Sequence, residues 1–180
     1  FINRATKGVY ELGSVLKTFT LAGGLNEGVI ETKSKFKNLP KKITCAGKSI
    51  SEYDNKIPAN LTAEEILIRS GNIGSVRIAQ KIGEIKMKNF LDKMGLLKKI
   101  KFDIDEVGQP LPVRWGKCKL ATASFGHGIT TTLLQLAKGY SIISNGGYII
   151  EPRLVKRSQL RTNKKIKILN NGISSKINSI

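Results

Sequence analysis

Apolar residues recur at helical spacing in five parts of this chain. Residues three and four positions apart share one face of a helix, so apolar side chains at that spacing bury one face. We predict helices from Ser14 to about Gly23, from Thr62 to just before Ser70, from about Gly74 to Ile82, from Lys88 to Met94 and from Thr131 to Ser144. The first and last of them are predicted to end at the glycine pairs Gly23-Gly24 and Gly146-Gly147, because glycine commonly follows a helix.

Strands are predicted to be few and short. Gly47 is flanked by two apolar-alternating arms, a pattern typical of a small hairpin. The strand-like segments are Ile43 to Cys45, Ser49 to Ile50, Tyr148 to Ile150 and Arg153 to Val155. Residues 101–120 contain glycine and two prolines and are predicted to be a loop. The basic tail from Arg157 shows only a loose pattern.

The composition is that of a globular protein with an unusual charge. Hydrophobic residues make up 40% of the 180 positions, and the net charge is +18. No stretch approaches the roughly 20 apolar residues that a membrane helix needs. Basic residues are spread along the whole chain and aromatic residues are only 6%, whereas a nucleic-acid module gathers arginines and aromatics on one surface. We interpret the charge as a lysine-rich bias with incidental attraction to anionic surfaces.

The two cysteines and the one histidine do not indicate a metal site. Cys45 and Cys118 stand alone, without a Cys-x-x-Cys pair, and His127 cannot complete a ligand set with them. A disulfide between the cysteines is possible in an oxidising compartment. We expect two free thiols, and we expect neither a metal nor another cofactor.

Candidate chemistry begins at Gly13-Ser14-Val15-Leu16-Lys17. A serine and a lysine three residues apart share a helix face. A buried lysine can be neutral and then accept the serine proton, which makes a nucleophile without histidine. The same spacing recurs at Ser34 and Lys37, in a polar stretch typical of a solvated surface. The alternative for Ser14 is a plain helix cap.

Further motifs follow in a fixed order. Ser70-Gly71-Asn72 lies between two predicted helices, and the later motifs are Ser124-Phe125-Gly126-His127-Gly128, Thr132 to Ala137, Asn145-Gly146-Gly147 and Pro152 to Val155. With Ser-x-x-Lys these motifs resemble the transpeptidase domain of a class B penicillin-binding protein. The resemblance covers roughly residues 3 to 156. The Ser-Phe-Gly-x-Gly form is most similar to the septum-building, cell-division branch.

The chain departs from the family pattern at three places. Leu12 and Leu133 stand where the family usually has prolines, which suit the first turn of a helix, so some rigidity is expected to be lost. No Lys-Thr-Gly or Lys-Ser-Gly triplet is present, and in the family that triplet follows the motifs found here. We therefore expect residues 1–180 to be a partial transpeptidase domain, truncated at both ends and inactive alone.

The resemblance implies an α/β (α+β) fold of the serine transpeptidase and β-lactamase type. A helical lobe packs beside an antiparallel sheet in that fold, and this chain is expected to hold mostly the helical lobe. The implied catalytic residues are Ser14 as nucleophile, Lys17 as general base and Ser70 as proton relay. Asn72, Gly126 and Gly128 are the implied substrate-binding residues.

The implied reaction is peptidoglycan cross-linking. Ser14 would take the acyl group of a stem peptide ending in D-Ala-D-Ala, and a neighbouring stem amine would then accept it. β-Lactams would acylate the same serine. The implied partners are stem peptides, β-lactams and membrane proteins of the division machinery, with no specific nucleic acid. The implied location is the bacterial cytoplasmic membrane, with the catalytic domain facing outward.

Two alternatives remain open. A β-lactamase or penicillin sensor shares the Ser-x-x-Lys pair and the fold, and Glu106 is a candidate for activating its deacylating water. A basic module that binds nucleic acid or an anionic surface is the other alternative, supported by charge alone. For His127 the choice lies between a base and a polar residue at the rim of the pocket, and we favour the rim because Ser14 already has Lys17.

Overall fold

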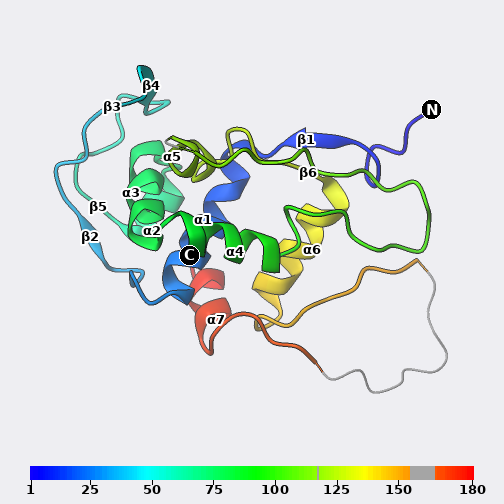
Figure 1. Ribbon diagram of the computed structural model, residues 1–180. Coiled ribbons are helices and arrows are strands. Elements are labelled where there is room, and N and C mark those ends of the chain that lie inside the picture. Colours follow the sequence, from blue (N-terminus) through cyan, green and yellow to red (C-terminus); the bar gives the residue numbers. More distant parts are fainter. Residues whose placement is uncertain (117, 155–164) are drawn as a thin grey trace.

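The computed structural model describes residues 1–116, 118–154 and 165–180. Helices dominate it, and the strands form three two-stranded antiparallel sheets (Figure 1). The helices are η1 (Gly13–Leu16, a 3-10 turn), α1 (Lys17–Asn26), α2 (Ala63–Ile68), α3 (Asn72–Ile82), α4 (Glu84–Lys93), α5 (Lys119–Ala123), α6 (Leu133–Ser144) and α7 (Ile173–Asn178). The sheets pair β1 (Val9–Glu11) with β6 (Thr130–Thr132), β2 (Lys35–Phe36) with β5 (Leu61–Thr62), and β3 (Lys42–Cys45) with β4 (Lys48–Ser51).

Helix α1 is the centre of the packing. It contacts α2, α3, α4 and α7, and in Figure 1 it lies among these helices. Helix α6 reaches it through Tyr140, whose ring meets Phe19 edge-on with centroids 5.1 Å apart. The Tyr140 hydroxyl donates a hydrogen bond to the Val15 carbonyl over 2.9 Å. The apolar residues of α1 are fully buried, so the residues at its N-terminus are held from several sides.

The predicted stop at Gly23-Gly24 is wrong, because α1 continues to Asn26. A Cβ at Gly23 would lie 3.2 Å from the Phe90 ring, and one at Gly24 would lie 2.7 Å from Ile30. The two glycines therefore allow neighbouring segments to approach a buried helix. This packing outweighs the low helix propensity of glycine.

Two helices begin at capping boxes, as their sequences indicate. Thr62 accepts a hydrogen bond from the Glu65 N–H, and the Glu65 side chain accepts one from the Thr62 N–H. Thr132 and Gln135 repeat this exchange at the start of α6. The capping box satisfies two backbone groups that the first turn leaves without intrahelical partners.

The other element predictions are confirmed with shifted boundaries or are wrong. The hairpin around Gly47 is confirmed as β3–β4. Helices α3 and α4 begin two and four residues earlier than predicted, and residues 130–132 form a strand before α6. The loop over 101–120 is confirmed for the described residues 101–116 and 118, and Lys119 and Leu120 open α5, whereas residue 117 lies outside the described residues. Helix α7 was not predicted.

The predicted C-terminal strands are largely absent from the described residues. Tyr148 makes only an isolated bridge with Lys167, and Arg153 and Leu154 are not in a strand. Val155 and the first part of the basic tail, to residue 164, lie outside the described residues. Tyr148 pairs instead with a segment about twenty residues later, a connection that local patterning does not reveal.

The prediction of two free thiols is wrong. Cys45 and Cys118 form a disulfide, with Cα atoms 5.7 Å apart and 73 positions apart in the sequence. The bond joins strand β3 to the residue before α5. Isolated cysteines give no sequence signal for such a pair, because proximity here depends on the tertiary fold.

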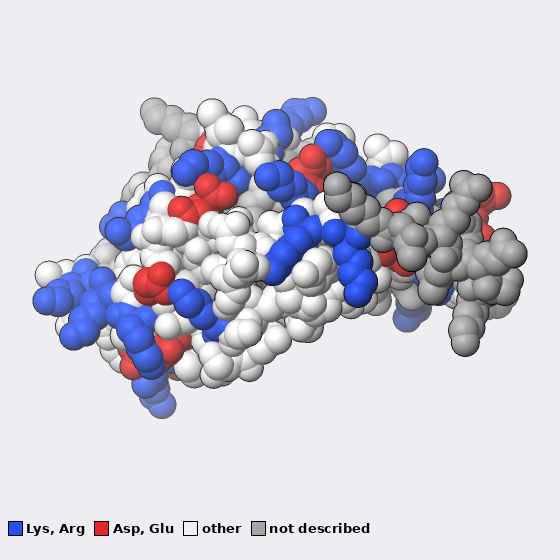
Figure 2. All heavy atoms as spheres, turned by 90° about the horizontal axis from the view of Figure 1, so that it is seen from below, with Lys and Arg blue, Asp and Glu red and all other residues white. Residues whose placement is uncertain are grey.

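On the face shown in Figure 2, basic side chains are spread out rather than gathered at one place. Lys and Arg lie at both ends of this face and in the middle, with acidic side chains between them. This distribution agrees with the interpretation of the charge as a compositional bias.

Candidate active site

Ser14 stands on a tight turn between β1 and α1. Gly13 has a φ of +56°, which glycine adopts at little cost. The turn is held by the neighbouring loop, because Leu12 N–H donates to the Ile129 carbonyl over 3.0 Å and Gly13 N–H donates to the Gly126 carbonyl over 3.3 Å. Ser14 itself lies exposed in η1, so its hydroxyl is accessible from solvent.

Lys17 begins α1 one turn after Ser14 and is buried, with only 2% of its surface exposed. Its Nζ donates to Ser14 Oγ over 3.2 Å, to Ser70 Oγ over 2.9 Å and to the Ser70 carbonyl over 2.5 Å. An ammonium has three N–H donors, so each has a partner. The structure thus brings together the three predicted catalytic residues.

The environment of Lys17 favours its neutral form. Burial lowers the pKa of Lys17 from 10.5 to about 8, and the negative charge of Glu52 partly opposes this by raising it. A fraction on the order of one tenth of the amine is therefore uncharged at pH 7. A neutral Lys17 has a lone pair and can accept the proton of Ser14.

Ser70 is held in a backbone conformation that serine rarely adopts. Its φ is +52°, which costs a residue with a Cβ roughly 1–2 kcal/mol. The Ser70 N–H donates to the Leu67 carbonyl and the Gly71 N–H to the Ile66 carbonyl, each over 2.9 Å. These two bonds form a Schellman motif at the end of α2, where glycine is usual. With serine there, both its carbonyl and its hydroxyl accept from Lys17.

Asn72 is the first residue of α3 and is partly exposed. Its side-chain amide donates to the Ser51 carbonyl over 2.9 Å, and its backbone N–H donates to Glu52 over 2.6 Å. The amide oxygen remains an acceptor that a substrate N–H can use. Its role in binding substrate stays a prediction.

Sequence reasoning missed Glu52. This residue follows β4 directly, and its carboxylate also accepts from the Ile73 N–H over 3.0 Å. Its partners are backbone groups of a helix about twenty residues later, so no local motif marks it. The only sequence clue was an acidic residue in a chain with few of them.

Gly126 and Gly128 both have positive φ, at +86° and +72°. A Cβ on Gly126 would lie 1.9 Å from the Gly13 carbonyl oxygen, and one on Gly128 would lie 2.1 Å from Lys119 Nζ. Gly126 therefore lets the loop approach the turn that carries Ser14, and Gly128 leaves room for the Lys119 side chain of α5. Their predicted contact with substrate stays a prediction.

His127 lies on the outside of the same loop, with 68% of its side chain exposed. Its Nδ1 is 2.8 Å from a Glu11 carboxylate oxygen. The Glu11 carboxylate also accepts from the Gly128 N–H, and Lys119 donates to the Gly128 carbonyl over 2.8 Å. The nitrogen within hydrogen-bond reach of Ser14 is that of Lys17, which agrees with a rim position for His127.

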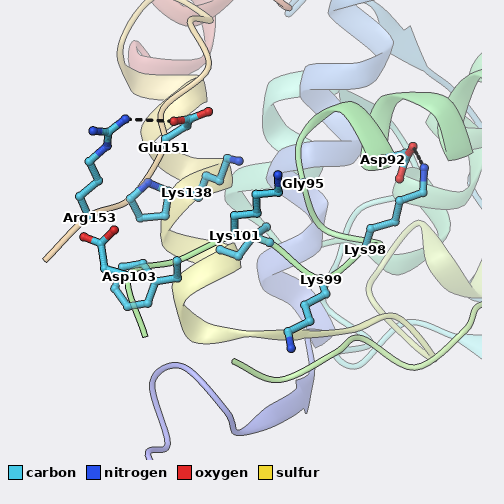
Figure 3. Close-up of a pocket in the computed structure, with 12 residues that line it drawn as sticks. Asp92, Gly95, Lys98, Lys99, Lys101, Asp103, Lys138, Glu151 and Arg153 are labelled. Atoms are coloured by element: carbon cyan, nitrogen blue, oxygen red, sulfur yellow. Dashed lines mark hydrogen bonds and ion pairs between the residues drawn. The ribbon is translucent and has the colours of Figure 1, made fainter. Parts of the chain in front are cut away.

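A cavity of about 560 Å³ lies apart from the serine centre. It is lined by Asp92 of α4 and residues that follow this helix, by Lys138 of α6 and by residues 151–153. Figure 3 shows basic and acidic side chains around it. Ion pairs join Lys98 to Asp92 and Arg153 to Glu151. None of the residues that line it is a predicted site residue, so the cavity does not contribute to the serine centre.

The part of the chain that the structure describes holds no cluster of three or more His, Cys, Asp or Glu suited to a metal ion. Within the same residues, no helix combines the length and the apolarity needed to span a bilayer.

Residues 1–178 match the family described as the penicillin binding protein transpeptidase domain. The chain belongs to this family. It is 35% identical over 147 residues to a probable peptidoglycan D,D-transpeptidase FtsI of Caulobacter vibrioides, and 29% identical over 151 residues to the peptidoglycan D,D-transpeptidase FtsI of Escherichia coli. Each alignment covers 81% of this chain but only 25% and 24% of those proteins. The chain thus spans about a quarter of these curated relatives.

Solved structures show the shared fold of the penicillin-binding transpeptidase domain. The TP domain of penicillin-binding protein 3 from Burkholderia pseudomallei superposes with a TM-score of 0.89 at 22% identity, covering 98% of this chain and 54% of that chain. Penicillin-binding protein 3 of Mycobacterium tuberculosis, solved in complex with aztreonam, gives 0.87 at 20% identity, covering 97% and 41%. The predicted class, a helical part beside antiparallel strands, is confirmed.

Proposed function

We propose that this chain is part of a peptidoglycan D,D-transpeptidase in which Ser14 forms the acyl-enzyme. The observation that carries the proposal is the buried Lys17 amine within hydrogen-bond reach of the hydroxyls of Ser14 and Ser70. The family and the FtsI relatives support it. The proposed reaction needs no cofactor.

In the first half of the proposed reaction, neutral Lys17 takes the proton of Ser14 Oγ. The oxygen then attacks the carbonyl carbon between the two D-Ala residues of a stem peptide. The Ser14 backbone N–H and the helix dipole are proposed to stabilise the developing oxyanion. Ser70 relays the proton from Lys17 to the leaving amine, the C–N bond breaks, and D-Ala departs.

In the second half, an amine of a neighbouring stem peptide attacks the acyl-enzyme. That amine loses a proton to Lys17, the ester bond to Ser14 breaks, and Ser14 Oγ regains a proton. The products are a new peptide cross-link and the free enzyme. A β-lactam mimics the stem terminus and is proposed to acylate Ser14 in the same way.

The proposal extends to the whole protein and its surroundings. We infer that residues 1–180 are a partial domain, and that a Lys-Thr-Gly strand in the longer protein completes the cleft. The chain alone is therefore expected to be inactive. Similarity to FtsI supports a septal role, at the outer face of the cytoplasmic membrane and beside division-machinery proteins. The Cys45–Cys118 disulfide supports an oxidising compartment.

The test uses the full-length protein and a fluorescent penicillin. Wild type is expected to become covalently labelled, and Ser14→Ala is expected to lose all labelling while remaining folded by circular dichroism. Labelling that persists in Ser14→Ala contradicts the proposal. The control is Ser34→Ala, which is expected to label like the wild type.

The lifetime of the adduct separates the alternative of a β-lactamase. A transpeptidase is expected to keep the penicilloyl group for hours, whereas a lactamase releases it far sooner. The β-lactamase hypothesis assigns Glu106 to activate the deacylating water. The Glu106 carboxylate accepts a hydrogen bond from the Asn3 N–H over 3.1 Å. The Ser-Phe-Gly-x-Gly motif and the match to the transpeptidase family support the transpeptidase.

A further inference from the structure

Glu52 joins two parts of the serine centre that are far apart in the sequence. Its carboxylate accepts from the first two backbone N–H groups of α3, those of Asn72 and Ile73. These groups have no intrahelical partner. Helix α3 has no capping side chain of its own, since Gly71 is its N-cap. Glu52 therefore supplies the cap from another element.

We propose that Glu52 is a positioning residue that holds the Ser70-Gly71-Asn72 turn against Lys17 by capping α3. This inference rests on the proposed function of Ser14 and Lys17. Glu52 touches neither serine hydroxyl, so it acts through the turn and not on the substrate.

The Ser70-Gly71-Asn72 turn must be stabilised from both sides, because Ser70 has an unfavourable backbone conformation. On the α2 side, the carbonyls of Ile66 and Leu67 accept from the turn. On the α3 side, Glu52 accepts from Asn72 and Ile73. With one side released, Ser70 is expected to relax toward a negative φ, and its hydroxyl and carbonyl then leave Lys17 Nζ.

The hairpin before Glu52 is well placed to keep it still. Ile50 of β4 is buried in the core, with 7% of its surface exposed. The Asn72 side chain donates to the Ser51 carbonyl. Strand β3 pairs with β4 and is tied to Cys118 by the disulfide. The position of Glu52 is thus fixed by the buried strand β4 that precedes it, by the hydrogen bond to the Ser51 carbonyl and by the disulfide of β3.

The charge of Glu52 affects the pKa of Lys17, and the pH dependence of acylation reports that pKa. A purely structural role of Glu52 would not shift this pH dependence. Of the described residues, Glu52 is the charged group found to raise the pKa of Lys17. The nearby titratable groups on the α5 side, Glu11, Lys119 and His127, interact with one another around Gly128. Replacing Glu52 by a neutral residue is therefore expected to lower the pKa of Lys17.

The experiment measures the acylation rate of the full-length protein by a fluorescent penicillin from pH 6 to 10. Glu52→Gln removes the charge and turns one acceptor oxygen into an N–H₂ that faces a backbone donor. The plateau rate is expected to fall by about tenfold to a hundredfold, since misplaced catalytic groups cost rates of this order. The rising limb of the pH profile is expected to move to lower pH.

Two further variants complete the test. Glu84→Gln removes an acidic residue from the first turn of α4 and is expected to change neither limb nor plateau. Glu52→Asp restores the charge on a shorter side chain and is expected to return the limb to its wild-type position with a reduced plateau. If Glu52→Gln does not fold, the test relies on Glu52→Asp. A plateau acylation rate in Glu52→Asp equal to that of the wild type then overturns the proposal.

The remaining outcomes are distinct. A limb that stays in place in folded Glu52→Gln overturns the proposal, whether or not the rate falls, because a fall alone indicates general loss of structure. Labelling that persists in Ser14→Ala contradicts the proposed function, not the positioning role of Glu52. The two failures are therefore read from different variants.

Discussion

The chain contains the pattern Ser-x-x-Lys twice, and the two copies have different surroundings. Ser14 and Lys17 lie at the start of a buried helix, and Lys17 Nζ is 3.2 Å from Ser14 Oγ. Ser34 precedes the strand β2, its Oγ accepts from the Glu31 N–H over 2.8 Å, and Lys37 is exposed. The same spacing thus gives a hydrogen-bonded pair with a buried lysine in one place and a solvated surface in the other.

The two copies differ in secondary structure, in burial and in hydrogen-bond partners, and these features determine whether the lysine can act on the serine. Residues three apart share a face of a helix, whereas in an extended strand they point to opposite faces. Burial then lowers the pKa of Lys17 to about 8, and the turn at Ser70 supplies two acceptors. Neither effect is contained in the four-residue motif.

The largest expected effect is that of removing the Lys17 amine. Lys17→Met keeps an apolar chain of similar length in the buried site but leaves no base for Ser14. The acylation rate of the full-length protein by penicillin is expected to fall about 10²- to 10⁴-fold, the usual contribution of a general base. Lys37→Met is the matched variant at the other copy and is expected to acylate at the wild-type rate. Equal rates in the two variants would mean that the difference in surroundings has no catalytic meaning.

A smaller effect is expected from the disulfide between Cys45 and Cys118. Replacing both Cys45 and Cys118 by serine is expected to lower the free energy of unfolding by about 2–4 kcal/mol, because the bond restricts the unfolded chain. Urea unfolding of the full-length protein measures this. Adding a thiol reductant is the control, since it should bring the wild type to the stability of the variant. If wild type and variant are equally stable without reductant, and reductant does not change the stability of the wild type, the disulfide is contradicted.

The smallest expected effect on stability concerns the positive φ of Ser70. Ser70→Ala and Ser70→Gly both remove the hydroxyl, and both are expected to slow acylation. Glycine adopts the left-handed conformation freely, so Ser70→Gly is expected to be more stable than Ser70→Ala by about 1 kcal/mol. Thermal unfolding compares the two variants directly. Equal stabilities would argue against the strained turn.

The sequence was informative where structure depends on near neighbours. Thr62 and Thr132 were predicted near helix starts, and both are caps of capping boxes. Ser14 and Lys17 were predicted to share a face because helical geometry alone brings them together. The position of Ser70 against Lys17 came from the family resemblance, since fifty-three residues separate the two.

The sequence was misleading or silent where tertiary contacts decide. Gly23 did not end its helix, because Phe90 packs against it. The sequence left a Cys45–Cys118 disulfide open but did not favour it, because 73 positions separate the two cysteines. Glu52 was missed, because its carboxylate serves backbone groups that only the folded chain brings near it.

The most direct test of the account is the pH dependence of acylation of the full-length wild-type protein. If an uncharged Lys17 takes the proton of Ser14, the acylation rate rises as Lys17 loses its own proton. With the pKa of Lys17 lowered to about 8, the rate is expected to increase with pH, to reach half its maximum near that value and to level off above it. A rate that stays constant or falls between pH 6 and 10 would contradict the proposal that uncharged Lys17 takes the proton of Ser14.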